Sequence, residues 1–147
     1  MAIRVLFLCT GNSARSQMAE GLLRDLGGDR FDVRSAGSQP SDRVHPMTGV
    51  VMDEVGISIA GAKPKHMSEF LNDRWDYVIT VCDRARDACP TFPGDTERIH
   101  WSFDDPAAAE GTERERLSVF RRVRNEILVR VRLFSNLDAT RVGVTEQ

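Results

Sequence analysis

The chain has 147 residues, of which 41% are hydrophobic and 29% are charged, and its formal net charge is -2. This length suits a single domain with one core, and the ordinary composition excludes a disordered or fibrous chain. A near-neutral charge argues against nucleic acid or an anionic membrane as a partner, because both attract an excess of basic residues. The apolar run over residues 5–8 is too short for a signal peptide or a membrane span, so we expect a cytoplasmic location.

Segments with strand and helix patterns alternate along the chain. Residues 3–8 form a continuous apolar run, which is typical of a strand buried on both faces. Residues 16–26 carry apolar side chains at helical spacing, and the pair Gly27-Gly28 ends this predicted helix. The pattern then predicts, in order, a strand over 31–35, a helix over 46–55, a short helix over 67–71, a strand over 77–81 and a strand over 98–101.

The last predicted element is a long amphipathic helix. Thr112 and Glu115 have the spacing of a capping box at its start. Apolar residues then follow at helical spacing: Leu117, Phe120, Val123, Ile127, Val131 and Phe134. After Leu137 the sequence turns polar, so we expect a catalytic domain over 1–137 and a flexible C-terminal tail over 138–147.

This alternation predicts the α/β fold class, as a single domain with a four-stranded parallel sheet flanked by helices on both faces. In such sheets ligands bind beyond the carboxyl ends of the strands. Cys9 and Cys82 each follow a predicted strand directly. We therefore expect two of the three cysteines at the functional edge of the sheet.

The segment from Cys9 to Ser16 joins the first predicted strand to the first predicted helix. Backbone N–H groups in such a loop converge on one point, and the positive end of the helix dipole adds to them. Gly11 permits a tight turn and Asn12 tolerates a left-handed backbone. With the charge of Arg15, these groups are expected to lower the pKa of Cys9 and to bind a tetrahedral oxyanion. The predicted oxyanion-binding residues are Thr10, Gly11, Asn12, Ser13, Ala14, Arg15 and Ser16.

Three cysteines cannot all pair within one chain, and in a reducing compartment they are better interpreted as reactive thiols than as structural disulfides. The alternative is that they are small buried hydrophobic residues. That alternative is weakest for Cys9, because of its loop and Arg15. No Cys-x-x-Cys pair and no histidine at metal-ligand spacing occurs, so we expect no metal site.

The segment from Val5 to Glu20 resembles the phosphate-binding loop of the low-molecular-weight protein tyrosine phosphatase superfamily. Within that superfamily the chain is most similar to the thioredoxin-coupled arsenate reductases. Ser-Ala-Gly at 35–37, the segment 78–90 and His-Trp-Ser-Phe-Asp-Asp-Pro at 100–106 carry the resemblance further. It extends from Ile3 to about Phe134 and implies a flavodoxin-like topology, catalytic roles for Cys9 and Arg15, and no bound cofactor.

The departing oxygen of the substrate needs a proton donor. The family's general acid is the aspartate that directly precedes a proline, which implies Asp105 rather than Asp104 in the segment Phe103-Asp104-Asp105-Pro106. The alternative interpretation of these residues is a solvated turn.

Cys82 and Cys89 distinguish a reductase from a phosphatase. A reductase must supply two electrons, which requires further thiols, whereas a phosphatase needs only the nucleophile, the arginine, the acid and water. The resemblance implies a relay from Cys9 to Cys82 to Cys89, with thioredoxin as the source of reducing equivalents. If residues 83–89 were helical, the two distal sulfurs would lie ~10 Å apart along the axis. A disulfide needs Cα atoms within about 7 Å, so we expect this segment to unwind.

Two other functions stay open at this stage. A low-molecular-weight tyrosine phosphatase would share the loop, but those enzymes usually carry aromatic residues after the Asp-Pro. Here Ala107, Ala108 and Ala109 follow Pro106, which favours a bare inorganic anion such as arsenate or phosphate. A non-catalytic oxyanion or redox sensor is the second alternative, although no partner-binding extension supports it. We expect a monomer, and we also expect weak phosphatase activity because the oxyanion loop is shared.

Some relatives bind potassium beside the loop. The matching positions here are Asn12, Glu20, Ser35 and Lys65. Since a lysine stands where those relatives have an aspartate, we hypothesise that its ammonium replaces the metal ion. The alternative is that Lys65 is a solvated surface lysine.

Overall fold

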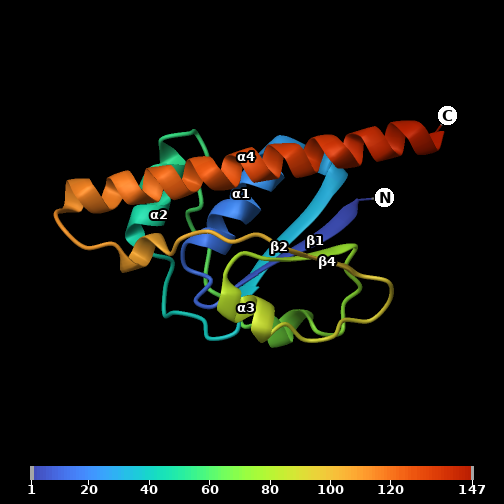
Figure 1. Ribbon diagram of the computed structural model, residues 1–147, viewed down its shortest axis with the longest axis horizontal. Helices are drawn as coiled ribbons and strands as arrows, with labels where there is room; N and C mark the ends of the chain where they lie inside the picture. The colour runs from blue at the N-terminus through green and yellow to red at the C-terminus, as the bar shows by residue number, and fades with distance from the viewer. Residues whose placement is uncertain (1, 147) are drawn as a thin grey trace.

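The computed structural model describes residues 2–146, with side chains described as far as Asn136. Figure 1 shows the elements. In chain order they are β1 (Ile3–Cys9), α1 (Arg15–Gly27), the 3₁₀ helix η1 (Gly28–Arg30), β2 (Phe31–Gly37), α2 (Pro46–Asp53), η2 (Met67–Phe70), β3 (Tyr77–Thr80), α3 (Asp83–Asp87), β4 (Glu97–His100), η3 (Pro106–Ala108) and α4 (Glu113–Glu146).

The four strands form one parallel sheet in the order β2-β1-β3-β4. This order confirms the predicted flavodoxin-like topology. Cys9 lies opposite Gly37 in the register, and Thr80 lies opposite Leu8 and His100. The carboxyl ends of all four strands therefore meet at one edge of the sheet, where the loop after Cys9 begins.

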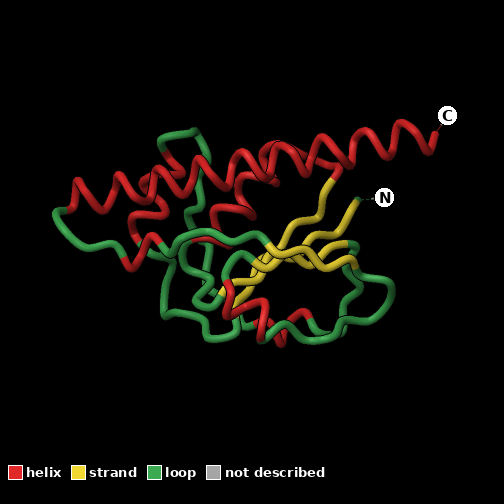
Figure 2. The backbone as a smooth tube through the Cα atoms, in the orientation of Figure 1, coloured by secondary structure: helices red, strands yellow, loops and turns green. Residues whose placement is uncertain are grey.

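The helices cover both faces of the sheet, as the sequence predicts. α1, α2 and α4 lie together on one side, and the short α3 lies on the other (Figures 1 and 2). α4 packs through the predicted apolar residues, of which Phe120, Val123, Ile127 and Val131 are fully buried. The capping box is confirmed as well, because the Glu115 N–H donates to Thr112 Oγ1 at 3.1 Å.

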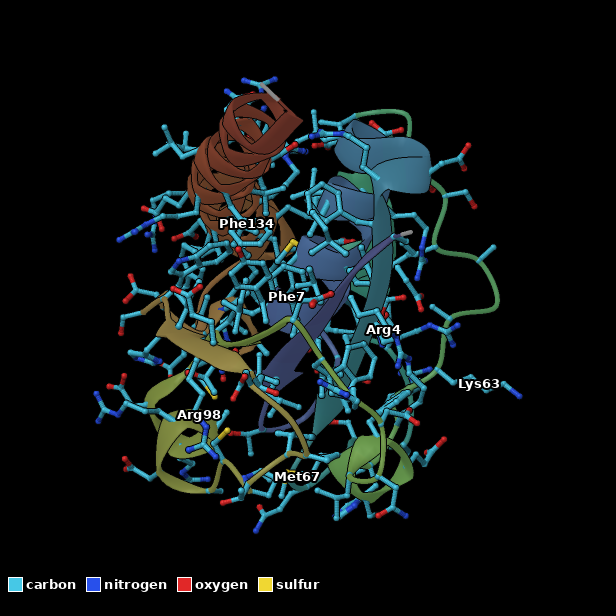
Figure 3. The ribbon with its side chains drawn as sticks, turned by 90° about the vertical axis from the view of Figure 1, so that its right-hand side faces the viewer. Arg4, Phe7, Lys63, Met67, Arg98 and Phe134 are labelled. Atoms are coloured by element: carbon cyan, nitrogen blue, oxygen red, sulfur yellow. The ribbon has the colours of Figure 1, made fainter. Side chains whose placement is uncertain are left out.

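The core lies between the sheet and α4. Residues 5–8 of β1 are almost completely buried on both faces, as their apolar run predicts. Trp101 joins the two layers, with its ring centroid 5.9 Å from that of Phe7 and 6.0 Å from that of Phe134. Figure 3 shows Phe7 and Phe134 in this interior. The strand that carries Cys9 is thus held rigidly by packing.

Element bounds differ from the sequence predictions mainly at chain segments without a periodic pattern. The sequence did not predict α3 as an element, because five residues are too few to show helical periodicity. α4 continues to Glu146, past Leu137, where the amphipathic pattern stops. A flexible tail over 138–147 stays a prediction. No helix in the described part of the chain is long and apolar enough to cross a membrane.

Candidate active site

A cavity of about 600 Å³ lies at the carboxyl edge of the sheet. It brings together the predicted nucleophile loop, the predicted acid and the second cysteine. The lining residues are Cys9, Thr10, Gly11, Ser13, Ala14, Arg15, Gln39, Ser41, Cys82, Asp83, Arg84, Asp105 and Ala107.

The peptide carbonyls of the nucleophile loop are tied to segments outside it. The carbonyls of Cys9, Thr10 and Gly11 accept from the N–H groups of residues 38, 39 and 41, at 3.2, 2.9 and 2.9 Å. The Ser13 carbonyl accepts from the N–H of His45 at 3.0 Å. In a trans peptide the N–H points opposite to the carbonyl, so the N–H groups of residues 10, 11, 12 and 14 face the other side. This arrangement provides the convergent donors that an oxyanion requires.

Asn12 fixes the shape of this loop. Its φ is 51°, the left-handed conformation that the sequence predicts, and its side chain is fully buried. Asn12 Nδ2 donates to Ser16 Oγ at 2.8 Å and to Ser35 Oγ at 3.0 Å. Asn12 Oδ1 accepts from Gln17 Nε2 at 3.2 Å and from the Lys65 N–H at 2.9 Å. The amide side chain therefore satisfies four partners and locks an otherwise unfavourable backbone conformation.

Two glycines allow other chain segments to approach the loop. A Cβ on Gly37 would stand 2.3 Å from the Thr10 carbonyl oxygen, and a Cβ on Gly11 would stand 2.8 Å from Ser41 Oγ. Gly11 does not adopt a positive φ, which falls on Asn12 instead. Gly11 thus gives room to the Ser41 hydroxyl, which could rotate away, whereas Gly37 faces backbone that cannot.

Arg15 and Asp105 lie side by side in the cavity. Arg15 Nη1 donates to the Phe103 carbonyl at 3.0 Å, and Nη2 lies 3.8 Å from Asp105 Oδ2. The Asp105 side chain also accepts from the Ala107 N–H at 3.0 Å and remains 46% exposed. Asp104, in contrast, pairs with Arg122 and does not line the cavity. The geometry thus favours the same aspartate as the resemblance.

Cys9 and Cys82 are both buried, both line the cavity, and each shifts the pKa of the other. The hydrogen bond from Cys9, with help from the Thr10 hydroxyl 3.3 Å away, lowers the pKa of Cys82 to about 5. The same hydrogen bond, together with burial, raises the pKa of Cys9, which Arg15 partly offsets. The pair therefore loses one proton easily and holds the second. The sequence predicts a lowered pKa for Cys9; the structure differs because Cys82, 73 positions away in the chain, lies beside it.

Cys89 lies beyond the end of α3 and is half-buried. Burial raises the pKa of its thiol, and its Sγ lies 3.6 Å from the Pro90 carbonyl oxygen. Arg98 on β4, labelled in Figure 3, donates to the same carbonyl at 2.7 Å. α3 ends at Asp87, so the helical geometry assumed from the sequence holds for only part of the segment between the two cysteines. Unwinding of that segment stays a prediction.

Three of the four residues of the proposed cation site come together. Ser35 Oγ donates to Glu20 and accepts from Asn12. The Lys65 ammonium lies elsewhere, donating to the Lys63 carbonyl at 3.1 Å, and only the backbone N–H of Lys65 joins the group. The cation beside Glu20 is Arg24, with Nη2 at 2.6 Å from Oε2. Among the described residues no cluster of metal ligands occurs.

The sequence did not reveal several polar residues of the site. Asp83 accepts from His100 at 3.0 Å and from Ser102 at 3.2 Å, which ties α3 to the end of β4. Gln17 bridges Asn12 and the Lys63 carbonyl. Except for the contact of Gln17 with Asn12, five residues away, these contacts join positions 17 to 46 residues apart, so no local pattern could indicate them.

Comparison with known proteins identifies the same protein family as the sequence resemblance. Residues 4–142 match the family model described as low molecular weight phosphotyrosine protein phosphatase. An arsenate reductase of Halalkalibacterium halodurans is 47% identical, over 89% of this chain and 94% of that protein. A solved structure of an arsenate reductase in the oxidized state has a TM-score of 0.77 and 34% identity, with 90% of this chain and 96% of that one covered. A thioredoxin-dependent arsenate reductase of Corynebacterium glutamicum has a TM-score of 0.61 and 33% identity, covering 90% of this chain and 63% of that one. The chain belongs to the low-molecular-weight phosphotyrosine protein phosphatase family and, within it, is similar to arsenate reductases.

Proposed function

We propose that this protein is an arsenate reductase that passes oxidation from Cys9 to Cys82 to Cys89 and is regenerated by thioredoxin. The observation that carries this proposal is the position of Cys82, which is buried and lines the same oxyanion cavity as Cys9. A phosphatase needs no second thiol there, whereas a reductase needs one within reach of the first. The arsenate reductase relatives and the thioredoxin-dependent relative support the same conclusion.

The first step is nucleophilic. Arsenate enters the loop, where the N–H groups and Arg15 hold its equatorial oxygens. The Cys9 thiolate attacks arsenic, so that an S–As bond forms and an As–O bond breaks. Asp105 protonates the departing oxygen, which leaves as water. For this step the charge of the thiol pair must reside on Cys9, with the remaining proton on Cys82.

The second step moves two electrons. Cys82 first gives up its remaining proton to solvent. Its thiolate then attacks the sulfur of Cys9, the S–As bond breaks, and the electron pair of that bond reduces arsenic from As(V) to As(III), which leaves as arsenite. The Cys89 thiolate then attacks Cys82, which releases the Cys9 thiolate and leaves a Cys82–Cys89 disulfide. Thioredoxin reduces that disulfide by exchange. The protein itself needs no bound cofactor.

A tyrosine phosphatase is the second candidate function, because the nucleophile, arginine and acid are the same. Ala107 lines the cavity where an aromatic side chain would support a phenyl ring. The small side chain favours an inorganic anion, so we propose that any phosphatase activity is weak. We further propose that the protein acts as a monomer in the cytoplasm.

Oxidation of NADPH in the presence of arsenate, thioredoxin and thioredoxin reductase tests this proposal. The wild-type chain should consume NADPH only with arsenate, and Cys82→Ser and Cys89→Ser should each abolish turnover. Hydrolysis of a phenyl phosphate is measured in parallel. Absence of arsenate-dependent oxidation, with phenyl phosphate hydrolysis unchanged in both variants, would show that the protein is a phosphatase.

A further inference from the structure

The charges around the cavity are poorly matched to a doubly charged anion. Four ionisable side chains besides the thiols line it: the cations Arg15 and Arg84 and the carboxylates Asp83 and Asp105. Hydrogen bonds from His100 and Ser102 lower the pKa of Asp83, so this carboxylate stays ionised. The thiol pair adds a further negative charge. Even with Asp105 protonated for its role as the acid, without Arg84 a single cation, Arg15, would face the ionised Asp83 and the charged thiol pair, which repel arsenate or phosphate.

Arg15 is largely occupied by other partners. Its guanidinium donates to the Phe103 carbonyl and lies 3.8 Å from Asp105, and its side chain is only 12% exposed. Arg84 differs in both respects. It is exposed at the rim of the cavity, and the ion pairs of the described side chains include its neighbour Arg86 but not Arg84. Its charge is therefore available to an incoming anion.

The neighbouring carboxylate is turned to another partner. Asp83 precedes Arg84 in the first turn of α3, and its Oδ1 is engaged by His100 Nε2 and Ser102 Oγ from the end of β4. These contacts pair Asp83 with residues at and after the end of β4, whereas the Arg84 side chain lines the same cavity and has no ion pair with any side chain that the structure describes. We infer that Arg84 is a substrate-binding residue, which captures the oxyanion and holds it for Cys9 together with Arg15.

This inference rests on the proposed function only in requiring that the cavity binds an oxyanion. It adds a residue on α3 to a binding site otherwise built from the loop before α1. Because α3 lies between Cys82 and Cys89, the same short element then serves both substrate binding and the thiol relay.

The test compares Arg84→Gln with Arg86→Gln. Arg86 is a matched control: it belongs to the same helix, carries the same charge, pairs with Asp87 at 3.3 Å and does not line the cavity. Arg84→Gln should raise the KM for arsenate about five- to tenfold with kcat changed less than about twofold, an effect that fades as salt screens the charge. Arg84→Lys should restore the KM to within about twofold, and Arg84→Glu should raise it further. Arg86→Gln should leave both constants unchanged.

A binding measurement separates this inference from the proposed function. Calorimetric titration of the reduced protein with inorganic phosphate reports on the cavity without turnover. Weaker phosphate binding by Arg84→Gln, with wild-type binding retained by Arg86→Gln, supports the inference. Equal phosphate affinity in wild type and Arg84→Gln, or equal loss in Arg84→Gln and Arg86→Gln, overturns it and leaves the reductase proposal intact. Absence of phosphate binding by the wild type, with no arsenate turnover, overturns both.

Discussion

The hydroxyl of Thr10 lies 3.3 Å from the sulfur of Cys82, although the two residues stand 72 positions apart in the sequence. Thr10 follows the nucleophile directly, so the loop that binds the oxyanion also contacts the second thiol. Together with the Cys9 hydrogen bond, this contact stabilises a thiolate on Cys82. Substrate binding and electron transfer are therefore coupled through adjacent residues of one loop.

Replacing Thr10 by valine should raise the pKa of Cys82. A hydrogen bond to a charged group contributes about 1.5 kcal/mol or more, which corresponds to a pKa increase of about one. The rate of Cys82 alkylation as a function of pH, followed by mass spectrometry of the labelled peptide, measures this. Thr10→Ser keeps the hydroxyl and should titrate as the wild type does. A Thr10→Val profile that matches Thr10→Ser would show that the contact is not a hydrogen bond to the thiolate.

Removing the Cys9 thiol should raise the pKa of Cys82 further. The Cys9 hydrogen bond is the largest cause of its depression to about 5, so Cys82 in Cys9→Ala should approach the ordinary thiol value. Below that value the variant would carry a neutral thiol where the wild type carries a thiolate. Thiolate absorbance in the far ultraviolet, measured across pH in a Cys89→Ser background, follows the change. A Cys82 that still titrates near 5 without Cys9 would mean that Thr10 and Arg15 alone hold the charge.

Gly37→Ala should destabilise the fold and lower activity. Its Cβ would collide with the Thr10 carbonyl oxygen at 2.3 Å, so the nucleophile loop must shift, at a cost of about 2 kcal/mol or more in the free energy of unfolding. Gly49→Ala is the matched control, since it lies in α2 with no atom within 4 Å of its Cβ. It should be stabilising by about 0.5–1 kcal/mol. Urea unfolding gives the free energy of unfolding of both variants, and steady-state kinetics gives their kcat/KM. A Gly37→Ala variant as stable and as active as Gly49→Ala would show that the loop does not need this glycine.

Arg24, rather than Lys65, should support the group around Glu20. Arg24 pairs with Glu20 and donates to the Val33 carbonyl at 2.7 Å, whereas the Lys65 ammonium donates to the Lys63 carbonyl at 3.1 Å. Arg24→Gln should therefore lower kcat/KM more than Lys65→Gln, and the wild type should work equally well in potassium and sodium salts. Steady-state rates in the two salts check both expectations. Clear potassium activation of the wild type would refute the idea that a protein cation fills this site.

The sequence predicts the fold well because its signals are local. The buried run before Cys9, the capping box at Thr112 and the apolar stripe of α4 each follow from the periodicity of one element, and the structure confirms them. The position of Asn12 in a left-handed turn was also predictable, because few other residues tolerate that conformation.

The remaining features depend on contacts between distant segments. The sequence predicts a lowered pKa for Cys9, whereas in the structure the pKa of Cys9 is raised and that of Cys82 is lowered. The reason is that each thiol is the largest influence on the other. Lys65 was expected to act through its ammonium, but the ammonium turns to Lys63 and only the backbone joins the site. Arg84 gave no signal in an arginine-rich chain. Its position at the cavity follows from the short α3, which is too short to show a periodic pattern.

The most direct test of the relay is the product of a single turnover in Cys89→Ser. The reduced variant receives one equivalent of arsenate without thioredoxin, is quenched in acid with an alkylating reagent, and is analysed by mass spectrometry of its peptides. If the relay operates, the variant forms a Cys9–Cys82 disulfide and releases one equivalent of arsenite, while the wild type gives a Cys82–Cys89 disulfide. A Cys89→Ser variant that releases arsenite repeatedly with thioredoxin, or that never forms the Cys9–Cys82 bond, would contradict it.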